Sequence, residues 1–451
     1  MRDTMTGQLL NSGLYKKKVD LVSSDILKNV GISKGFIIWM AFLAIAFGAC
    51  IFAYTIQLRK GLGVTGLRDI TSWGMYIANF VFFVATSLVG MLISCVLGLA
   101  GANWIKPIGR IAEIIAVAFA AVAGLVIISD MGRPDRLTYL FIFGRVQSPI
   151  LWDVSVVTTY FVLSLLLWFL PMIPDLAISK SRLTDQPGFL KKAYDLLSFK
   201  WVHHEAQYKI LSQAVRILLI LVIPTAFAIH TVTSWLFAVT PRAGWDSTIF
   251  GPYFVSGAFV SGTAAVIIAM YFFRETYNLR KYLTSDHFEK MGRVLILVSV
   301  LYMYFNLNEF LVPGYKLKAL DAIHLKELFS GKYAALFWGV QLFGLVIPVL
   351  LMLFRSIRKP LPMMLISIIM LAAAWLKRFI IVVPPQAHPF LPVQNFPAEW
   401  IIYKPTLIES LVTVASMLLV LIIITVLSKL FPVMPIWELA ADETEKETKK
   451  M

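Results

Sequence analysis

The sequence predicts an all-α integral membrane protein with about ten transmembrane helices. Three observations support this fold class: 59% of the 451 residues are hydrophobic, only 15% are charged, and the apolar residues form long runs. A helix needs about 20 apolar residues to cross a bilayer, and these runs reach about that length. In chain order, the predicted spans are Gly35–Leu58, Trp73–Leu99, Ile108–Ile128, Leu151–Leu170, Tyr208–Trp235, Gly251–Phe273, Arg293–Val312, Tyr333–Phe354, Leu361–Phe379 and Thr406–Phe431.

A faint internal repeat predicts how these spans group. Gly74-Met-Tyr76 and Gly251-Pro-Tyr253 open spans two and six, which run in the same direction. We therefore expect two four-helix bundles, residues 73–240 and 251–380, flanked by helices 35–58 and 406–431; a chance match is the alternative. We also expect a polar and basic N-terminal segment (1–34), a short surface helix near Gly188–Phe199 and a disordered Lys/Glu-rich tail (438–451).

The charge distribution predicts the orientation in the membrane. The net charge is +15, and most Lys and Arg residues fall in the tails and loops that share a side with the N-terminus. Because positive loops stay in the cytoplasm and the number of spans is even, we expect both termini there. Basic residues spread over membrane loops argue against a nucleic-acid partner.

The residue types present restrict the redox chemistry of the chain itself. Two cysteines, Cys50 and Cys95, are too few for an iron–sulfur cluster or a Cys-rich zinc site. Of six histidines, His230 alone lies well inside a span, whereas transmembrane haems usually need a pair. We therefore expect no metal, haem or iron–sulfur cluster, so any electrons must leave through another subunit.

Polar side chains from four consecutive spans are predicted to lie at one depth, near the outer face: Tyr76, Asn79, Asp130, Asp153 and His230. Ionisable groups in a membrane are costly, so such a cluster indicates a proton or ligand site. A quinone fits, because its carbonyls need hydrogen-bond donors and its redox chemistry needs groups that exchange protons. The alternative is that these groups only tie helices together.

Roles are assigned to these residues as hypotheses. Asp130, Asp153 and His230 are the candidate catalytic residues. Tyr76, Asn79 and Arg133 are the candidate quinone-binding residues, with Arg133 just beyond the third span, at the rim.

A second set of polar residues is predicted to lie deeper in the membrane than the first set, or in the second of the two bundles. Tyr302, Asn306 and Glu309 are spaced by four and three, so they share one helix face. Together with Glu113 and Arg216 they are the candidate proton path. The alternatives are a buried Glu113–Arg216 ion pair and a hydrogen-bonded helix contact on the seventh span.

Several sequence strings resemble the NrfD / polysulfide-reductase membrane-subunit family over roughly residues 35–430. They are Ser72-Trp-Gly-Met-Tyr-Ile-Ala-Asn79, Asp130-Met-Gly-Arg-Pro134, Ser148-Pro-Ile-Leu-Trp-Asp153 and His230-Thr-Val-Thr-Ser-Trp235. Two more, Gly244-Trp-Asp-Ser-Thr-Ile-Phe-Gly-Pro-Tyr-Phe-Val-Ser-Gly257 and Tyr277-Asn-Leu279, look closest to the ten-span branch with the quinol-oxidising subunits of alternative complex III.

The resemblance implies a subunit of the prokaryotic inner membrane that exchanges electrons with menaquinone or ubiquinone, its exchangeable substrate. It implies a ferredoxin-like iron–sulfur partner on the outer face, and a molybdopterin enzyme, multihaem cytochrome or hydrogenase beyond it. By motif, Asp130 and Asp153 match the family's acidic or His–Asp positions near the quinol headgroup, and His230 matches its span-five histidine. Asp130 stands where the alternative-complex-III branch has His, so the direction of electron flow stays open.

Two other functions compete with quinone exchange. The chain could be a quinone-free structural and proton-conducting anchor of a redox complex. A secondary transporter is the third hypothesis, which the concentration of polar residues near the outer edge, rather than the midplane, argues against.

Overall fold

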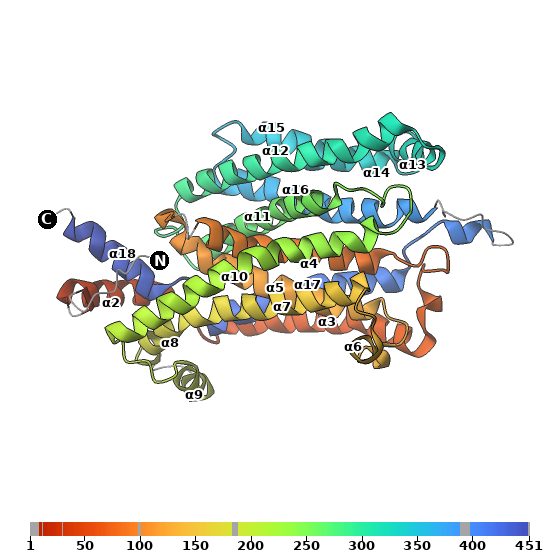
Figure 1. Cartoon of the computed structure of the whole chain (residues 1–451). Helices are drawn as coiled ribbons and strands as arrows, with labels where there is room; N and C mark the ends of the chain where they lie inside the picture. Colours follow the sequence, from red (N-terminus) through yellow and green to blue (C-terminus); the bar gives the residue numbers. More distant parts are fainter. Residues whose placement is uncertain are drawn as a thin grey trace.

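The computed structural model describes residues 9–10, 12–28, 30–97, 101–182, 188–387 and 397–449, which form helices and connecting loops (Figure 1). In this part of the chain, 10 helices are long and apolar enough to cross a membrane, which confirms the predicted all-α membrane fold. Residues 1–8, 11 and 29 of the predicted N-terminal segment, residues 98 and 99 of the second predicted span and the last two residues of the predicted tail lie outside the described residues.

The ten spanning segments follow the predicted order. They are α3 (Lys34–Lys60), α4 (Met75–Leu92) with its π-helical continuation η2 (Ile93–Leu97), α5 (Lys106–Ser129), α7 (Pro149–Phe169) continued by α8 (Ile173–Lys180), α10 (Glu205–Ala238), α11 (Phe250–Thr276), α12 (Ser285–Lys316), α14 (Ala334–Trp338) with π-helix η6 (Gly339–Val346) and α15 (Ile347–Met352), α16 (Pro360–Val382) and α17 (Leu407–Leu430). At 34 and 32 residues, α10 and α12 exceed the roughly 20 residues that a bilayer requires.

Local sequence signals set the ends of the flanking helices. The Ser33 hydroxyl accepts a hydrogen bond from the backbone N–H of Phe36, and the residue that follows the last turn of α3 is Gly61, which has a φ of 76°. At α17, Thr406 and Glu409 form a reciprocal capping box. These caps satisfy backbone groups that the first turn of a helix leaves unpaired.

The two most buried helices lie side by side at the centre of the molecule. α4 packs against α5, α10 and α11, and α11 packs against α12 and α16. α3 and α17 pack together and expose most of their apolar surface, with α17 also touching α5. Figure 1 shows α12 and α15 on the opposite side of the molecule from α3. The division into two bundles stays a prediction.

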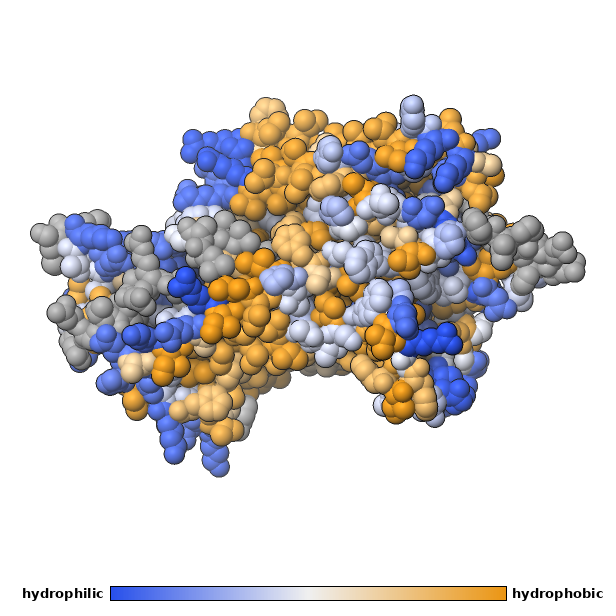
Figure 2. Space-filling model, in the orientation of Figure 1, coloured by the Kyte–Doolittle hydropathy of each residue, from blue (hydrophilic) through white to orange (hydrophobic). Residues whose placement is uncertain are grey.

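Both termini lie at one end of the molecule, called here the terminal end. This end carries α2 (Gly13–Leu27), α9 (Gly188–Leu197) and α18 (Ile436–Thr448); α9 confirms the predicted surface helix. The other end, called the loop end, carries α6 (Tyr139–Phe143) and α13 (Ala319–Phe329). In Figure 2, apolar side chains form the middle of the visible surface and hydrophilic ones gather toward both ends, as a membrane protein requires.

The expectation of a disordered C-terminal tail is wrong. Residues 436–448 form α18, which packs against α2, α5 and α8. Ile436, Trp437 and Leu439 are buried there, and Lys106 of α5 bonds Asp442 at 2.9 Å. Apolar residues at the start of the segment therefore supply the burial that outweighs its charged composition.

The spanning segment formed by α14, η6 and α15 contains the longer of the two π-helices in the described residues. The π-helix η6 begins at Gly339 and contains Gly344, where an added Cβ would lie 2.1 Å from the Cβ of Ala373 on α16. Only glycine permits this close contact between η6 and α16. Isolated π-helical turns often mark functional positions, and this one borders a cavity described below.

Candidate functional site

The carboxylate of Asp130 lies directly after the last residue of α5, at the loop end. Its Oδ1 is buried and has no hydrogen-bond partner among the described residues. Burial, followed by the nearby negative charge of Glu409, raises the pKa of Asp130 to about 7. This carboxyl group therefore changes its protonation state in the physiological pH range.

A hydrogen-bonded pair lies beside this carboxylate. Tyr76 of α4 donates to the Gln57 side-chain oxygen at 2.6 Å, and the Gln57 amide donates to the Ser129 carbonyl at 2.7 Å. Tyr76 is also within electrostatic range of Asp130 and Glu409. The structure thus brings together two predicted site residues, Tyr76 and Asp130, and adds Gln57 from the first span.

Glu409 of α17 is the second residue that sequence reasoning missed. It is fully buried and accepts hydrogen bonds from Tyr403 (2.6 Å), the backbone N–H of Gly66 (2.8 Å) and Thr406 (2.9 Å). Burial and the negative charge of Glu409 raise the pKa of the Tyr403 phenol. These contacts fix the Glu409 side chain within electrostatic range of Asp130.

Asn79 forms hydrogen bonds to two neighbouring helices. Its amide donates to Thr413 of α17 at 2.8 Å and accepts from the Trp375 indole of α16 at 2.7 Å. Asn79 therefore ties α4 to two other helices, which is the alternative that the sequence left open for it.

Asp153 and His230 are both buried but have separate partners. Thr233 of α10 donates a hydrogen bond to Asp153 of α7. His230 lies beside the Ala226 carbonyl one turn earlier and within electrostatic range of Arg378 on α16. No contact between either residue and Asp130 occurs among those the structure describes, so their place in one site stays a prediction.

Arg133 lies at the surface of the loop end. Its guanidinium bonds Asp135 at 3.1 Å, and the two side chains are 64% and 61% exposed. The side chain is therefore available to a partner or ligand, and its predicted contact with a quinone remains untested.

The predicted stripe on α12 is confirmed as one buried face. Tyr302, Asn306 and Glu309 are each about 8% exposed. Tyr302 donates to the Tyr253 hydroxyl (3.3 Å), and Tyr253 donates to Asn306 (3.0 Å). Asn306 in turn donates to Gln341 of η6 at 2.7 Å. The segments α11, α12 and η6 therefore share one hydrogen-bonded chain.

Two cations complete this second cluster, and sequence reasoning missed both. Lys377 and Arg378 of α16 are 3% and 2% exposed. The Glu309 carboxylate interacts electrostatically with Lys377, whose ammonium lies 4.6 Å from the Phe310 ring centre. In the sequence, these two adjacent basic residues lie inside an apolar span, and this unusual placement could have identified them as candidate site residues.

The other two residues of the predicted proton path do not join this cluster. Glu113 is buried in the half of α5 nearer the terminal end, within electrostatic range of Arg110. Arg216 is exposed on α10, so the alternative of a buried Glu113–Arg216 pair is wrong. Arg110 instead forms a buried ion pair with Asp175. A continuous proton path remains a prediction.

In the described ranges, no three His, Cys, Asp or Glu side chains are grouped closely enough to hold a metal ion.

Comparison with known proteins identifies relatives with related roles. A selenate reductase subunit of Mesobacillus selenatarsenatis is 25% identical over 391 residues, which cover 84% of this chain and 90% of the relative. The Hdr-like menaquinol oxidoreductase integral membrane subunit of Archaeoglobus fulgidus is 23% identical over 408 residues, covering 87% and 92%. A putative dimethyl sulfoxide reductase membrane subunit of Halobacterium salinarum is 30% identical over 234 residues, and there the match spans about half of each chain.

The match to a known family extends over most of the chain, well beyond the short sequence strings. Residues 63–389 match the family described as polysulphide reductase, NrfD. This range contains α4 to α16 and every predicted site residue. The chain therefore belongs to the NrfD polysulphide reductase family, as its sequence strings predict.

Proposed function

We propose that this chain is the quinone-exchanging membrane subunit of a respiratory oxidoreductase complex. The names of two relatives support a redox complex, and one of them specifies menaquinol. The observation that carries the proposal is the Asp130 carboxylate, which has a buried, unpartnered oxygen beside the Gln57–Tyr76 hydrogen bond.

The residues of this site suit a quinone headgroup. Asp130 can accept a proton from a quinol hydroxyl when ionised and can donate one to a quinone carbonyl when protonated. The Tyr76 hydroxyl and the Gln57 amide supply polar contacts that orient the ring. The bound quinone supplies the two-electron chemistry, while the protein positions it and moves the proton.

The remaining parts of the proposal concern partners and orientation. We infer that the loop end faces away from the cytoplasm in a prokaryotic inner membrane and docks an iron–sulfur subunit there. The exposed Arg133 and Asp135 side chains lie at this end and are available to such a partner. We infer that the exchanged quinone is menaquinone or ubiquinone.

Removal of quinone from the assembled complex tests this function. After extraction of membrane quinones and reconstitution into liposomes, electron exchange with the partner subunit should fall at least about tenfold and recover when menaquinone or ubiquinone is added back. Unchanged partner reduction in quinone-free liposomes would instead support the structural, proton-conducting anchor.

A further inference from the structure

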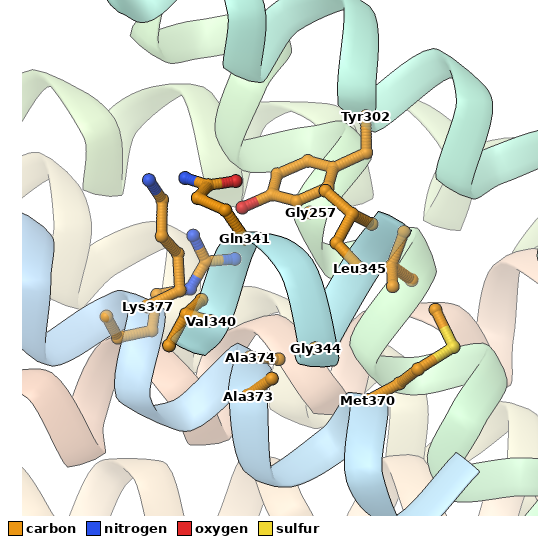
Figure 3. A pocket seen from close by; sticks show the side chains of 12 residues that line it. Gly257, Tyr302, Val340, Gln341, Gly344, Leu345, Met370, Ala373, Ala374 and Lys377 are labelled. Atoms are coloured by element: carbon orange, nitrogen blue, oxygen red, sulfur yellow. The ribbon is translucent and has the colours of Figure 1, made fainter. Parts of the chain in front are cut away.

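A small cavity lies within the second polar cluster, between α11, η6 and α16 (Figure 3). Its lining includes Gly257, Tyr302, Gln341, Gly344, Lys377 and Arg378. The site is separate from the Asp130 region and contains none of the residues proposed to bind the quinone.

The Arg378 guanidinium lines this cavity without a partner for two of its nitrogens. Nε and Nη1 are buried and make no hydrogen bond to any residue that the structure describes. The guanidinium carbon lies 5.1 Å from the centre of the Phe254 ring. Gly257 gives the group space, since a Cβ there would lie 2.9 Å from Nη2. Buried hydrogen-bond donors without acceptors are costly, which indicates a missing acceptor.

The charges around Arg378 do not balance. Glu309 interacts electrostatically with Lys377, and it is not among the groups that act on Arg378. The groups that interact most favourably with Arg378 are the phenols of Tyr253 and Tyr302, which carry no formal charge. A guanidinium stays ionised in proteins, so one positive charge within the membrane remains uncompensated among the described residues.

The size of the cavity limits what can balance this charge. Its volume is about 20 Å³. About 10–15 Å³ suffices for a water molecule, whereas a cavity that admits benzene measures about 150 Å³. A quinone ring is therefore too large, and a single small ion or a water molecule fits.

We propose that this cavity binds one small monovalent anion of about the size of chloride. The Nε–H and Nη1–H groups of Arg378 donate hydrogen bonds to the anion, and Lys377 adds a longer-range attraction. The anion neutralises the surplus charge and holds the joined helices α11, η6 and α16 together. This structural anion is independent of the quinone chemistry proposed above.

Thermal unfolding of the purified complex tests the anion site. At constant ionic strength, replacing gluconate by chloride should raise the unfolding midpoint of this subunit saturably, by about 2 °C or more. The Arg378→Gln variant should lose this response, because it removes the charge that the anion balances. Arg216→Gln is the matched control, since it removes an exposed arginine from a spanning helix and should retain the full response.

A direct binding measurement keeps the proposal testable if Arg378→Gln does not fold. Radioactive chloride should bind the wild-type complex with about one more ion per copy than the Gly257→Ala variant, whose new methyl group would displace the guanidinium. Equal binding by the two proteins would overturn the proposal. A chloride-independent midpoint, or equal responses in wild type and Arg378→Gln, would also overturn it and leave a cavity that holds only water.

Discussion

Replacing Asp175 with asparagine is expected to destabilise the chain by about 3–5 kcal/mol. Asp175 of α8 and Arg110 of α5 form an ion pair in which the two side chains are 0% and 2% exposed. Removing one charge of a buried pair leaves the other without compensation, which costs about this much. Asp175 also accepts a hydrogen bond from the backbone N–H of Trp437 at 2.9 Å, so the docking of α18 should weaken as well.

The size of this effect is measured by thermal or denaturant unfolding of the purified chain in detergent. Asp195→Asn is the matched control, because Asp195 pairs with Lys180 at the surface, where both side chains are more than 50% exposed. Such a pair contributes about 0–1 kcal/mol. A double variant, Asp175→Asn with Arg110→Gln, should lose less stability than the sum of the single changes. Equal stability of Asp175→Asn and Asp195→Asn would show that the buried pair does not hold this end together.

Asp130→Asn is expected to lower quinone-dependent turnover of the assembled complex by about 100-fold or more. Asparagine keeps the shape of the side chain but cannot exchange a proton, and a positioned acid or base contributes about 10²–10⁴-fold. Binding of the quinone should change little, so the loss should appear in kcat rather than in KM. Asp195→Asn is the matched control, since Asp195 lies on α9 at the terminal end, is exposed and pairs with Lys180.

The pH profile adds a second test of Asp130 and reports the direction of electron flow. Its pKa is raised to about 7 by burial and by Glu409, so the carboxyl is neutral below this pH and ionised above it. Quinol oxidation needs the ionised form and should rise with pH through about 7. Quinone reduction needs the protonated form and should fall over the same range. A wild-type profile that Asp130→Asn leaves unchanged would remove Asp130 from the proton step.

The sequence was sufficient to predict the fold because spanning helices leave a simple pattern. Apolar runs of about 20 residues predicted all ten spans, and the resemblance of short strings to one family is confirmed by the match over residues 63–389. The C-terminal tail was the clear error. Its charged composition concealed a short apolar stretch, Ile436–Ala441, that becomes stable only by packing on α2, α5 and α8.

The candidate site was harder to predict, because the position of a residue along a helix does not determine which neighbouring helix its side chain contacts. Asn79 and Tyr76 share a helix face, yet Asn79 bonds α16 and α17 while Tyr76 bonds Gln57 of α3. Gln57 and Glu409 belong to the two flanking helices, so a prediction confined to the four-helix bundles could not include them. A glutamine within an apolar span, and a glutamate in a Thr-x-x-Glu capping box, were the signals available.

In the second cluster, the sequence predicted the residues that share one helix but not their partners on other helices. Spacing alone predicted the shared face of Tyr302, Asn306 and Glu309, since these residues lie on one helix. Their partners Lys377 and Gln341 come from other spans, and only packing brings them to α12. The π-helical geometry of η6, which places Gln341 there, has no strong sequence signature.

The central claim is that a quinone headgroup binds beside Asp130. Photoaffinity labelling of the intact complex with an azido-substituted quinone, followed by peptide mapping, tests it most directly. The proposed site predicts labelling of peptides that contain Gln57, Tyr76 or Asp130, suppressed by excess unlabelled quinone and retained in Asp130→Asn. Competable labelling confined to other parts of this chain, or to another subunit, would contradict it.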